Sequence, residues 1–457
     1  MMNYSILETA KKYAVDYLLE ADGKPVFPGA DALALLNNFS IPLPASSANP
    51  ETVLRVLHEN GSINTAKSTG ARYFGFVFGG TLPASLAANW LAGAWDQNAA
   101  FRISSPIAAQ LEKVAGSWLL DLLRLPANAA TGFVTGTTMA NFCSMLAARH
   151  AIYKRKGWDS RAKGINGAPV IKVVTGEEVH ASMLRALMFA GFGIDNLIKV
   201  PTDEQGRIKA DKIPLLDDNT IVCIQAGNVN TGAIDPIKAI CLQAQQSGAW
   251  VHIDGAFGLW ARVSEHKAIL AEGCELADSW AIDLHKWLNV PYDSGLVICK
   301  DAAVLKEALS ISAAYLPDSI EAEPSAYTPE LSRRARGIET WAALYSLGRQ
   351  GTVELIERCC RLATLFAERL RTAGFNVLNE VVLNQVLVSF GDAATTTAVI
   401  KKVQDDGTCW CGGTVWKGTT AMRISVSSWM TTEKDIEQSA QVIARVANTV
   451  IKEGPVG

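Results

Sequence analysis

Short apolar runs rich in β-branched residues alternate with helix-length segments over most of the chain. From about Ser105 onward, the clearest of these runs are Val170–Val174, Ile221–Ile224, Trp250–Ile253 and Gly295–Ile298. Strands that are separated by helices in this way predict a mainly parallel sheet with helices on both faces. The hydrophobic pattern therefore indicates an α/β fold.

The pattern changes near residue 333, and a smaller domain is expected beyond it. Two helix-like stretches, 334–349 and 353–373, lead into short predicted strands and helices over 375–452, which is typical of an α+β domain. Residues 1–105 are rich in Pro, Gly and aromatic residues and show no clean period, so we expect them to pack on a partner subunit. The predicted organisation is an N-terminal segment (1–105), a large domain (106–332) and a small C-terminal domain (333–457).

Charge and composition exclude several classes of partner. The 457 residues include 42 basic and 45 acidic ones, without a basic block of the kind that binds nucleic acid or an anionic membrane. The N-terminus lacks an apolar signal region, and the longest apolar stretch, 82–95, is too short and interrupted to span a bilayer. Nine scattered cysteines are typical of a reducing compartment. We therefore expect a soluble cytoplasmic protein.

A metal site is not expected. Cys409 and Cys411 are separated by one residue, and no matching cluster of His or Cys accompanies them. Zinc sites combine such pairs with further ligands at regular spacing.

Candidate chemistry lies where predicted strands end and loops lead into helices, because ligands of open α/β sheets bind at that edge. The turn Gly136-Thr137-Thr138 precedes an amphipathic stretch over 140–153. Backbone N–H groups, hydroxyls and the helix dipole at such a turn can hold a phosphate. A helix cap without a ligand is the simpler explanation of this turn taken alone.

Two further strand ends carry groups suited to a planar ring. Asp254 ends an apolar run and is followed by small residues; its carboxylate could keep a pyridine nitrogen protonated, or it could cap the next helix. His180 follows another run and could lie on the ring or transfer protons, or it could be a hydrogen-bonded histidine at a helix start. A third exit, residues 226–236, is polar and Gly-rich, and loop formation alone explains most of it.

Lys286, in His285-Lys286-Trp287, follows the apolar run that ends at Asp283. A lysine amine at a strand end is a nucleophile suited to an aldehyde cofactor, although a single such lysine is usually a solvated surface residue. The phosphate turn, His180, Asp254 and Lys286 each stand on a separate strand exit. Together they favour one cofactor site over four unrelated structural roles.

With these motifs the chain resembles the pyridoxal-5'-phosphate (PLP) enzymes of the aspartate aminotransferase fold, fold type I. The specific likeness is to the pyridoxal-dependent amino-acid decarboxylases, which include aromatic amino-acid and glutamate decarboxylases. Beyond the four motifs it covers Arg72–Gly80, Ser104–Glu112, Ser332–Trp341 and Arg423–Ser427. The resemblance implies a lyase that releases carbon dioxide and an amine from an L-amino acid, in a homodimer with the site at the interface.

The resemblance also implies roles for individual residues. Lys286 would form the Schiff base, Asp254 would pair with the pyridine nitrogen, and His180 and Ala256 would lie on the two faces of the ring. The residues that would line the phosphate site are Gly136, Thr137, Thr138 and His285, and Asp283 stands where relatives have a phosphate-side Asn or Asp.

Two departures from the family pattern leave the reaction open. Where many relatives have Gly-Thr-Thr, this chain has Gly227-Asn228-Val229, so Asn228 would replace a hydroxyl. The segment between Tyr315-Leu316 and Arg333 is shorter than in the aromatic decarboxylases, whose mobile loop supplies a tyrosine that protonates the product carbon; Tyr327 is the candidate here. The alternatives are another PLP reaction, namely carbon–carbon lyase, aldehyde synthase or aminotransferase chemistry, and a cofactor-binding protein without activity.

The substrate is indicated only by aromatic residues. Tyr73, Phe74, Phe76 and Phe78 lie in a segment that shapes the substrate pocket in relatives, which favours an apolar or aromatic side chain. Arg334 and Arg423 are candidates for binding a substrate carboxylate, or for structural ion pairs.

Overall fold

The computed structural model describes residues 4–19, 24–310 and 323–454. The chain divides into two compact units, which we call unit 1 (residues 1–78, 365–378 and 386–457) and unit 2 (residues 79–364 and 379–385). In this division the N-terminal segment up to residue 78 belongs to the same unit as the C-terminal part of the chain. The limits at residues 105 and 333 themselves stay predictions.

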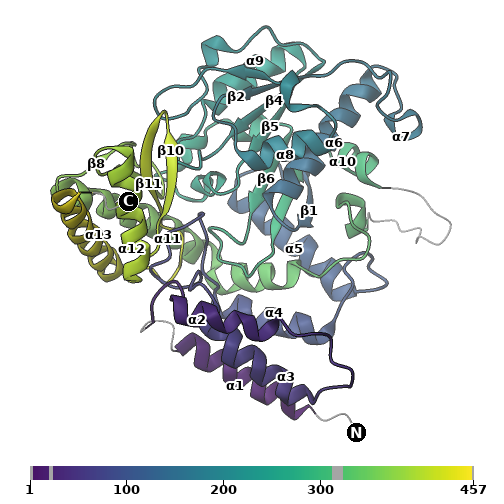
Figure 1. Cartoon of the computed structure of the whole chain (residues 1–457). Coiled ribbons are helices and arrows are strands. Elements are labelled where there is room, and N and C mark those ends of the chain that lie inside the picture. Colours follow the sequence, from purple (N-terminus) through teal and green to yellow (C-terminus); the bar gives the residue numbers. More distant parts are fainter. Residues whose placement is uncertain (1–3, 20–23, 311–322, 455–457) are drawn as a thin grey trace. The chain divides into compact units, whose positions relative to one another are not determined.

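Unit 2 is built on a seven-stranded sheet of order β1-β7-β6-β5-β4-β2-β3 (Figure 1). Its strands are β1 (Ala130–Val134), β2 (Lys172–Gly176), β3 (Ile198–Val200), β4 (Thr220–Gln225), β5 (Trp250–Asp254), β6 (Ser279–Asp283) and β7 (Gly295–Cys299). The strands from β6 to β3 are parallel, so the predicted α/β fold with a mainly parallel sheet is confirmed.

Strand β7 departs from the parallel arrangement and runs antiparallel to both β1 and β6. Residues 284–294, which connect β6 to β7, are all described and contain no helix. A parallel neighbour needs a long crossover connection, usually a helix, whereas a short return produces an antiparallel pair.

Unit 2 also contains helices, several of which, such as α6, cover its sheet (Figure 1). They are α4 (Pro83–Trp95), α5 (Pro106–Leu122), α6 (Thr137–Arg155), α7 (Ser160–Lys163), α8 (Ala181–Phe189), α9 (Ile237–Ser247), α10 (Ala302–Leu309) and the first part of α11 (Gly337–Thr372). Helix α6 packs on β6 and β7 and against α8 and α10. Helix α11 is broken at Gly348, where φ is 60°. The break agrees with the two separate helix-like stretches that the sequence predicts.

Every residue of β4, β5, β6 and β7 is buried. Strands that are covered on both faces need apolar side chains at successive positions, which explains the continuous apolar runs in the sequence. All nine cysteines lie within the described residues, and each is a buried free thiol. No helix of the described residues is long and apolar enough to cross a membrane.

Unit 1 contains a four-stranded sheet of order β10-β11-β9-β8. Its strands are β8 (Asn376–Val377), β9 (Gln385–Ser389), β10 (Gly412–Trp416) and β11 (Thr419–Ser425), and its C-terminal helices are α12 (Ala393–Asp406) and α13 (Glu433–Glu453). The expected mixture of short strands and helices over 375–452 is therefore confirmed. A capping box between Thr432 and Asp435 begins α13.

The N-terminal part of unit 1 forms helices that the sequence pattern did not predict. They are α1 (Ser5–Leu19), α2 (Ala30–Ala34) and α3 (Pro50–Val56). None of the residues described in these three helices is buried. In α1 the partly buried residues, among them Ile6, Ala10, Tyr13 and Tyr17, recur at helical spacing and form one face.

A buried ion pair in unit 2 gives a testable prediction of stability. Arg333 donates from Nη1 and Nη2 to the two carboxylate oxygens of Glu112 at 2.7 and 2.8 Å, and the two side chains are only 2% and 8% exposed. Replacing Arg333 by methionine would leave a buried carboxylate without its partner. We expect the free energy of unfolding, measured by urea denaturation, to fall by about 3–5 kcal/mol.

The matched control is Arg349→Met, because the Arg349–Asp121 pair is 59% and 71% exposed. Exposed pairs contribute about 1 kcal/mol or less. The double variant Arg333→Met/Glu112→Leu should recover most of the lost stability, since no charge is then left unpaired. Equal losses for Arg333→Met and Arg349→Met would contradict the prediction.

Candidate active site

The residues selected from the sequence follow the ends of strands along one edge of the unit 2 sheet. Asp283 ends β6, Asp254 ends β5, Asn228 follows β4 and His180 follows β2. These strands are parallel, so their carboxyl ends share one edge. Strand β1, which leads to Gly136, has the same direction because β7 is antiparallel to both β1 and β6.

The turn at Gly136 and Thr137, which we call the anion cradle, has groups that suit an anion. Gly136 is the N-cap of α6 and provides no side-chain cap. A Cβ atom there would lie 3.0 Å from His285 Cε1 and 3.1 Å from Asp283 Oδ1, so only glycine fits without displacing them. Thr137 Oγ1 is buried and has no hydrogen-bond partner within the described chain. An unpaired hydroxyl at a helix N-terminus fits a phosphate group.

Lys286 lies beside this cradle. Its Nζ atom is 2.8 Å from Asp283 Oδ2, and Asp283 Oδ1 accepts from the Thr137 backbone N–H at 2.6 Å. Burial alone would raise the pKa of the Asp283 carboxyl, but the charges of Lys286 and His285 and the bonds from Lys286 and Thr137 hold it below its usual value. The arrangement joins an amine, a carboxylate and a helix N-terminus in one cluster.

His285 completes the cluster. Its Nδ1 atom accepts from the Ser294 backbone N–H at 3.1 Å, its Nε2 atom is 3.5 Å from Asp283 Oδ1, and its ring stacks on Tyr292 with 4.4 Å between centroids. Burial lowers the pKa of His285, and the nearby Asp283 carboxylate opposes this shift in part. Because Nδ1 is an acceptor, Nε2 carries the ring proton toward the cradle.

Asp254 is a buried carboxylate with a donor on each oxygen. Asn141 Nδ2 donates to Oδ2 at 2.9 Å, and the Ala256 backbone N–H donates to Oδ1 at 3.2 Å. The carbonyl of Ala256 accepts from the Asp283 backbone N–H at 3.0 Å, which ties the ends of β5 and β6 together. A buried, fixed carboxylate of this kind suits the protonated nitrogen of a pyridine ring.

His180 is the N-cap residue of α8. Its Nδ1 atom accepts from the Ser182 backbone N–H at 3.1 Å and lies 2.7 Å from Ser182 Oγ. Gln225 at the end of β4 donates to the Glu178 carbonyl at 3.0 Å and holds the His180 loop beside the neighbouring strand. His180 is therefore a hydrogen-bonded histidine at a helix start, which was the simpler of the two interpretations of the sequence. Its contact with a cofactor ring stays a prediction.

Asn228 is buried in the turn after β4. Its Oδ1 atom accepts from the backbone N–H groups of Asn230 and Thr231 at 2.9 and 3.2 Å. Its Nδ2 atom is buried and has no partner among the residues that the structure describes. The Asn228 side chain thus has a hydrogen-bond donor available in Nδ2. That Asn228 takes the place of the hydroxyl found in relatives stays a prediction.

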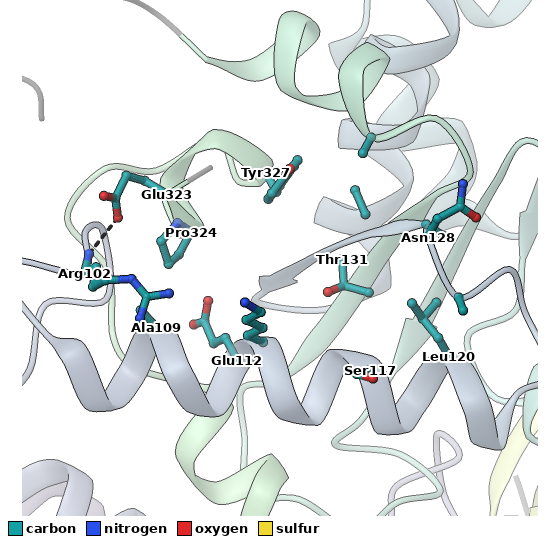
Figure 2. A pocket seen from close by; sticks show the side chains of 15 residues that line it. Arg102, Ala109, Glu112, Ser117, Leu120, Asn128, Thr131, Glu323, Pro324 and Tyr327 are labelled. Atoms are coloured by element: carbon teal, nitrogen blue, oxygen red, sulfur yellow. Dashed lines mark hydrogen bonds between the residues drawn. The ribbon is translucent and has the colours of Figure 1, made fainter. Parts of the chain in front are cut away.

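Tyr327 is among the described residues, and its contact with the Lys286 cluster stays a prediction. It ends the 3₁₀ turn η10 (Pro324–Tyr327) and lines a cavity of about 600 Å³ together with Arg102, Lys113 and Thr131 (Figure 2). The described lining of this cavity includes none of the other predicted site residues. Tyr327 is placed there because η10 packs against β1 and α10. Tyr315 and Leu316 lie outside the described residues.

Sequence reasoning missed two groups that shape the cluster. Asn141 lies one turn after Thr137 on α6, and this spacing within the helix could have indicated a second polar contact. Gly79 lies against the carbonyl of Lys286, where any side chain would overlap it. The paired glycines 79 and 80 were the available signal.

Arg334 is engaged in a structural ion pair, with Nη1 at 2.7 Å from Glu339 Oε1. Among the described residues, no group of three or more His, Cys, Asp or Glu side chains is arranged to hold a metal ion.

Known proteins are similar to this chain in sequence and in fold. Residues 49–391 match the family model described as pyridoxal-dependent decarboxylase conserved domain. An aromatic-L-amino-acid decarboxylase from Bacillus atrophaeus is 28% identical over 73% of this chain and 70% of that protein. A phenylacetaldehyde synthase from a Rosa hybrid cultivar is 25% identical over 76% of this chain and 75% of that protein.

Similarity to solved structures extends over nearly the full length. The crystal structure of Oryza sativa TDC with PLP and tryptamine superposes with a TM-score of 0.89 at 21% identity, covering 98% of this chain and 97% of that one. The predicted fold type I is thereby confirmed. The family match spans well over half of the chain. This chain is therefore an enzyme that uses pyridoxal 5'-phosphate, a carboxy-lyase of the pyridoxal-dependent decarboxylase family.

Proposed function

We propose that this enzyme is an L-amino-acid decarboxylase that releases carbon dioxide and an amine. The observation that supports this most is the cluster of Lys286, Asp283 and Thr137 at the carboxyl edge of the sheet, with the buried Asp254 on the next strand. When bound, PLP supplies an electron-accepting ring that stabilises the carbon from which the carboxylate departs.

The side chains of this chain have distinct roles in the proposal. Lys286 supplies the amine that holds the cofactor and is displaced by the substrate amine. Asp254 accepts the hydrogen bond of the pyridine N–H, and His180 and Ala256 confine the ring from its two faces. The groups proposed for the phosphate are Gly136, Thr137, Thr138 and His285, with Asp283 at its side and Asn228 as a further donor to the cofactor.

The last step returns a proton to the product carbon. His180 and Lys286 are the donors that we propose, because Tyr327 lines a cavity whose described lining includes neither of them. A positioned general acid typically contributes about 10²–10⁴ in rate.

The same placement of Tyr327 favours one alternative, an aldehyde synthase. If the carbon is not protonated, molecular oxygen can oxidise it, and the amino acid, oxygen and water then give an aldehyde, carbon dioxide, ammonia and hydrogen peroxide. The relative named phenylacetaldehyde synthase supports keeping this candidate.

Product analysis separates the two reactions. The PLP-loaded enzyme would be incubated with each L-amino acid, and carbon dioxide, amine, aldehyde, keto acid and peroxide would be quantified by mass spectrometry and a peroxide assay. Amine in a one-to-one ratio with carbon dioxide is expected. Aldehyde and peroxide in that ratio would establish the alternative, and absence of carbon dioxide with every amino acid would refute both.

For the substrate we propose an aromatic L-amino acid. In unit 1, Tyr73 stacks on Trp410 with 4.9 Å between centroids, and Phe76 lies 5.3 Å from the same ring. Phe76 and Val77 have φ values of 54° and 60°, a strained conformation that tends to occur at functional sites. We expect kcat/KM for the best aromatic amino acid to exceed that for glutamate and aspartate; a preference for either acidic amino acid would refute this proposal.

We also propose a cytoplasmic homodimer with the active site at the interface. Large apolar side chains are exposed on the N-terminal part of unit 1, including Leu7, Leu18, Phe27, Leu36, Phe39 and Val53. Apolar surface of this extent is typical of protein interfaces, and nine free thiols are typical of a reducing compartment. Sedimentation velocity should give twice the chain mass of 49.0 kDa; a monomer at micromolar concentration would count against the dimer.

Asp283 places a negative charge beside the proposed phosphate site. Asparagine would still accept from the Thr137 N–H through its side-chain oxygen but would not repel a phosphate dianion. Removing a repulsion of about 1 kcal/mol should lower the dissociation constant of PLP roughly fivefold in Asp283→Asn. Equilibrium dialysis of the apoprotein with PLP measures this.

Asp278→Asn is the matched control, because Asp278 precedes the other end of β6 and its carboxylate accepts from the Val251 N–H at 2.8 Å. Its PLP affinity should equal that of the wild type. Weaker binding by Asp283→Asn than by this control would show that the ion pair with Lys286 outweighs the repulsion.

A further inference from the structure

A continuous chain of hydrogen bonds leads through the core of unit 2 to Asp254. Trp250 Nε1 lies 3.0 Å from Ser279 Oγ, which lies 3.0 Å from His252 Nδ1. His252 Nε2 lies 2.9 Å from Asn141 Oδ1, and Asn141 Nδ2 lies 2.9 Å from Asp254 Oδ2.

The members of this chain come from three adjacent elements. His252 and Ser279 are direct neighbours in the parallel pair of β5 and β6. Asn141 reaches them from α6, which packs on β6. Asn141, His252 and Ser279 are 0% exposed, so their hydrogen bonds are shielded from bulk water.

The donors and acceptors give this chain of hydrogen bonds one direction. The Asp254 carboxylate accepts from Asn141 Nδ2, so Asn141 Oδ1 faces His252 and accepts from its Nε2–H. His252 Nδ1 is then an acceptor and takes the proton of the Ser279 hydroxyl, whose oxygen accepts from the Trp250 N–H. Burial lowers the pKa of His252 to about 3, so the neutral imidazole that this direction requires is the form present at neutral pH.

We propose that Asn141, His252 and Ser279 are positioning residues that present Asp254 to the ring nitrogen of the cofactor as a hydrogen-bond acceptor. The inference rests on the proposed function, in which Asp254 faces that nitrogen. Each bond in a directed chain polarises the next one. Asn141 thereby supports negative charge on Oδ2 and favours keeping the shared proton on the ring nitrogen.

Helix α6 gives the arrangement a second consequence. Its first residue, Thr137, forms the anion cradle, and Asn141 one turn later holds Asp254. Residues four apart on a helix lie on the same face. One rigid element therefore positions both the proposed phosphate site and the carboxylate proposed for the opposite end of the ring.

The experiment measures the protonation of the ring nitrogen itself. Wild type and Asn141→Leu would be loaded with PLP labelled with ¹⁵N in the ring, and the ¹⁵N chemical shift would be recorded without substrate. Leucine is close in size but provides neither donor nor acceptor. We expect the shift to move toward that of an unprotonated pyridine, and kcat to fall about 10–100-fold with KM changed by less than about threefold.

Ser279→Ala is the second test variant, since it removes the hydroxyl two bonds away and changes the core little. A smaller shift in the same direction is expected. In the cofactor-free wild type, the imidazole ¹⁵N signals of His252 should report a neutral ring protonated at Nε2 between pH 6 and 8. A ring protonated at Nδ1 would overturn the direction of the chain and with it the proposal.

Ser144→Ala is the matched control, because Ser144 is buried on the same helix and its hydroxyl has no partner in the described part of the chain. It should leave the ring-nitrogen shift and kcat unchanged. If Asn141→Leu and Ser279→Ala give the wild-type ring-nitrogen shift, the chain is only a way to bury polar groups and the proposal is wrong. This outcome is separate from failure of the proposed function, because the measurement needs bound PLP but no substrate or turnover.

Discussion

Replacing Lys286 by alanine is expected to prevent covalent attachment of PLP and to lower turnover by at least about 10³-fold. The structure places Nζ of Lys286 at the anion cradle, 2.8 Å from Asp283 Oδ2. Without it the substrate amine has no protein-bound cofactor to exchange with, and one of the two proposed proton donors is lost.

Borohydride reduction, proteolysis and mass spectrometry test the attachment directly. The wild type should give one peptide modified at Lys286, and Lys286→Ala should give none. Lys300→Ala is the control, since Lys300 follows β7 at the opposite edge of the sheet. A modified peptide at another lysine of the wild type would overturn the assignment of Lys286.

Loss of the Asp254 carboxylate is expected to have the second largest effect. Asp254→Asn keeps an acceptor for Asn141 but removes the charge that pairs with the ring nitrogen, so the ring accepts electrons poorly. We expect kcat to fall by about 10³-fold, whereas His180→Ala, which removes a facial contact and one candidate donor, should cost about 10–100-fold.

The comparison between these two variants decides the assignment. Both must be loaded with PLP to the same extent, and urea denaturation should confirm that each is folded. The substitution at Asp254 should act on kcat more than on KM, because the charge matters most when electrons enter the ring. Activity of Asp254→Asn above a tenth of the wild-type value would contradict the role of an electron sink.

Sequence reasoning predicted the strand exits because each one has a local signal. An apolar run buried on both faces ends at a polar or small residue, as at Asp254 and Asp283, and the order of such exits along a parallel sheet places them at one edge. The bond between Asn141 and Asp254 has no local signal. It depends on how α6 packs over the sheet, which only the folded chain shows.

Two other features were missed for related reasons. The reversed direction of β7 follows from the helix-free connection after β6, not from the composition of β7 itself. The helices α1, α2 and α3 of the N-terminal segment contain no fully buried described residue, and the sequence pattern did not predict them.

The reaction of the nine buried thiols can be used to follow the opening of the core. Seven of them, from Cys143 to Cys360, belong to unit 2, and Cys409 and Cys411 belong to unit 1. Burial raises the pKa of Cys143 and Cys223, so these thiols are poor nucleophiles while the protein is folded. Alkylation followed by peptide mapping would thus time the unfolding of each unit separately, without any engineered label.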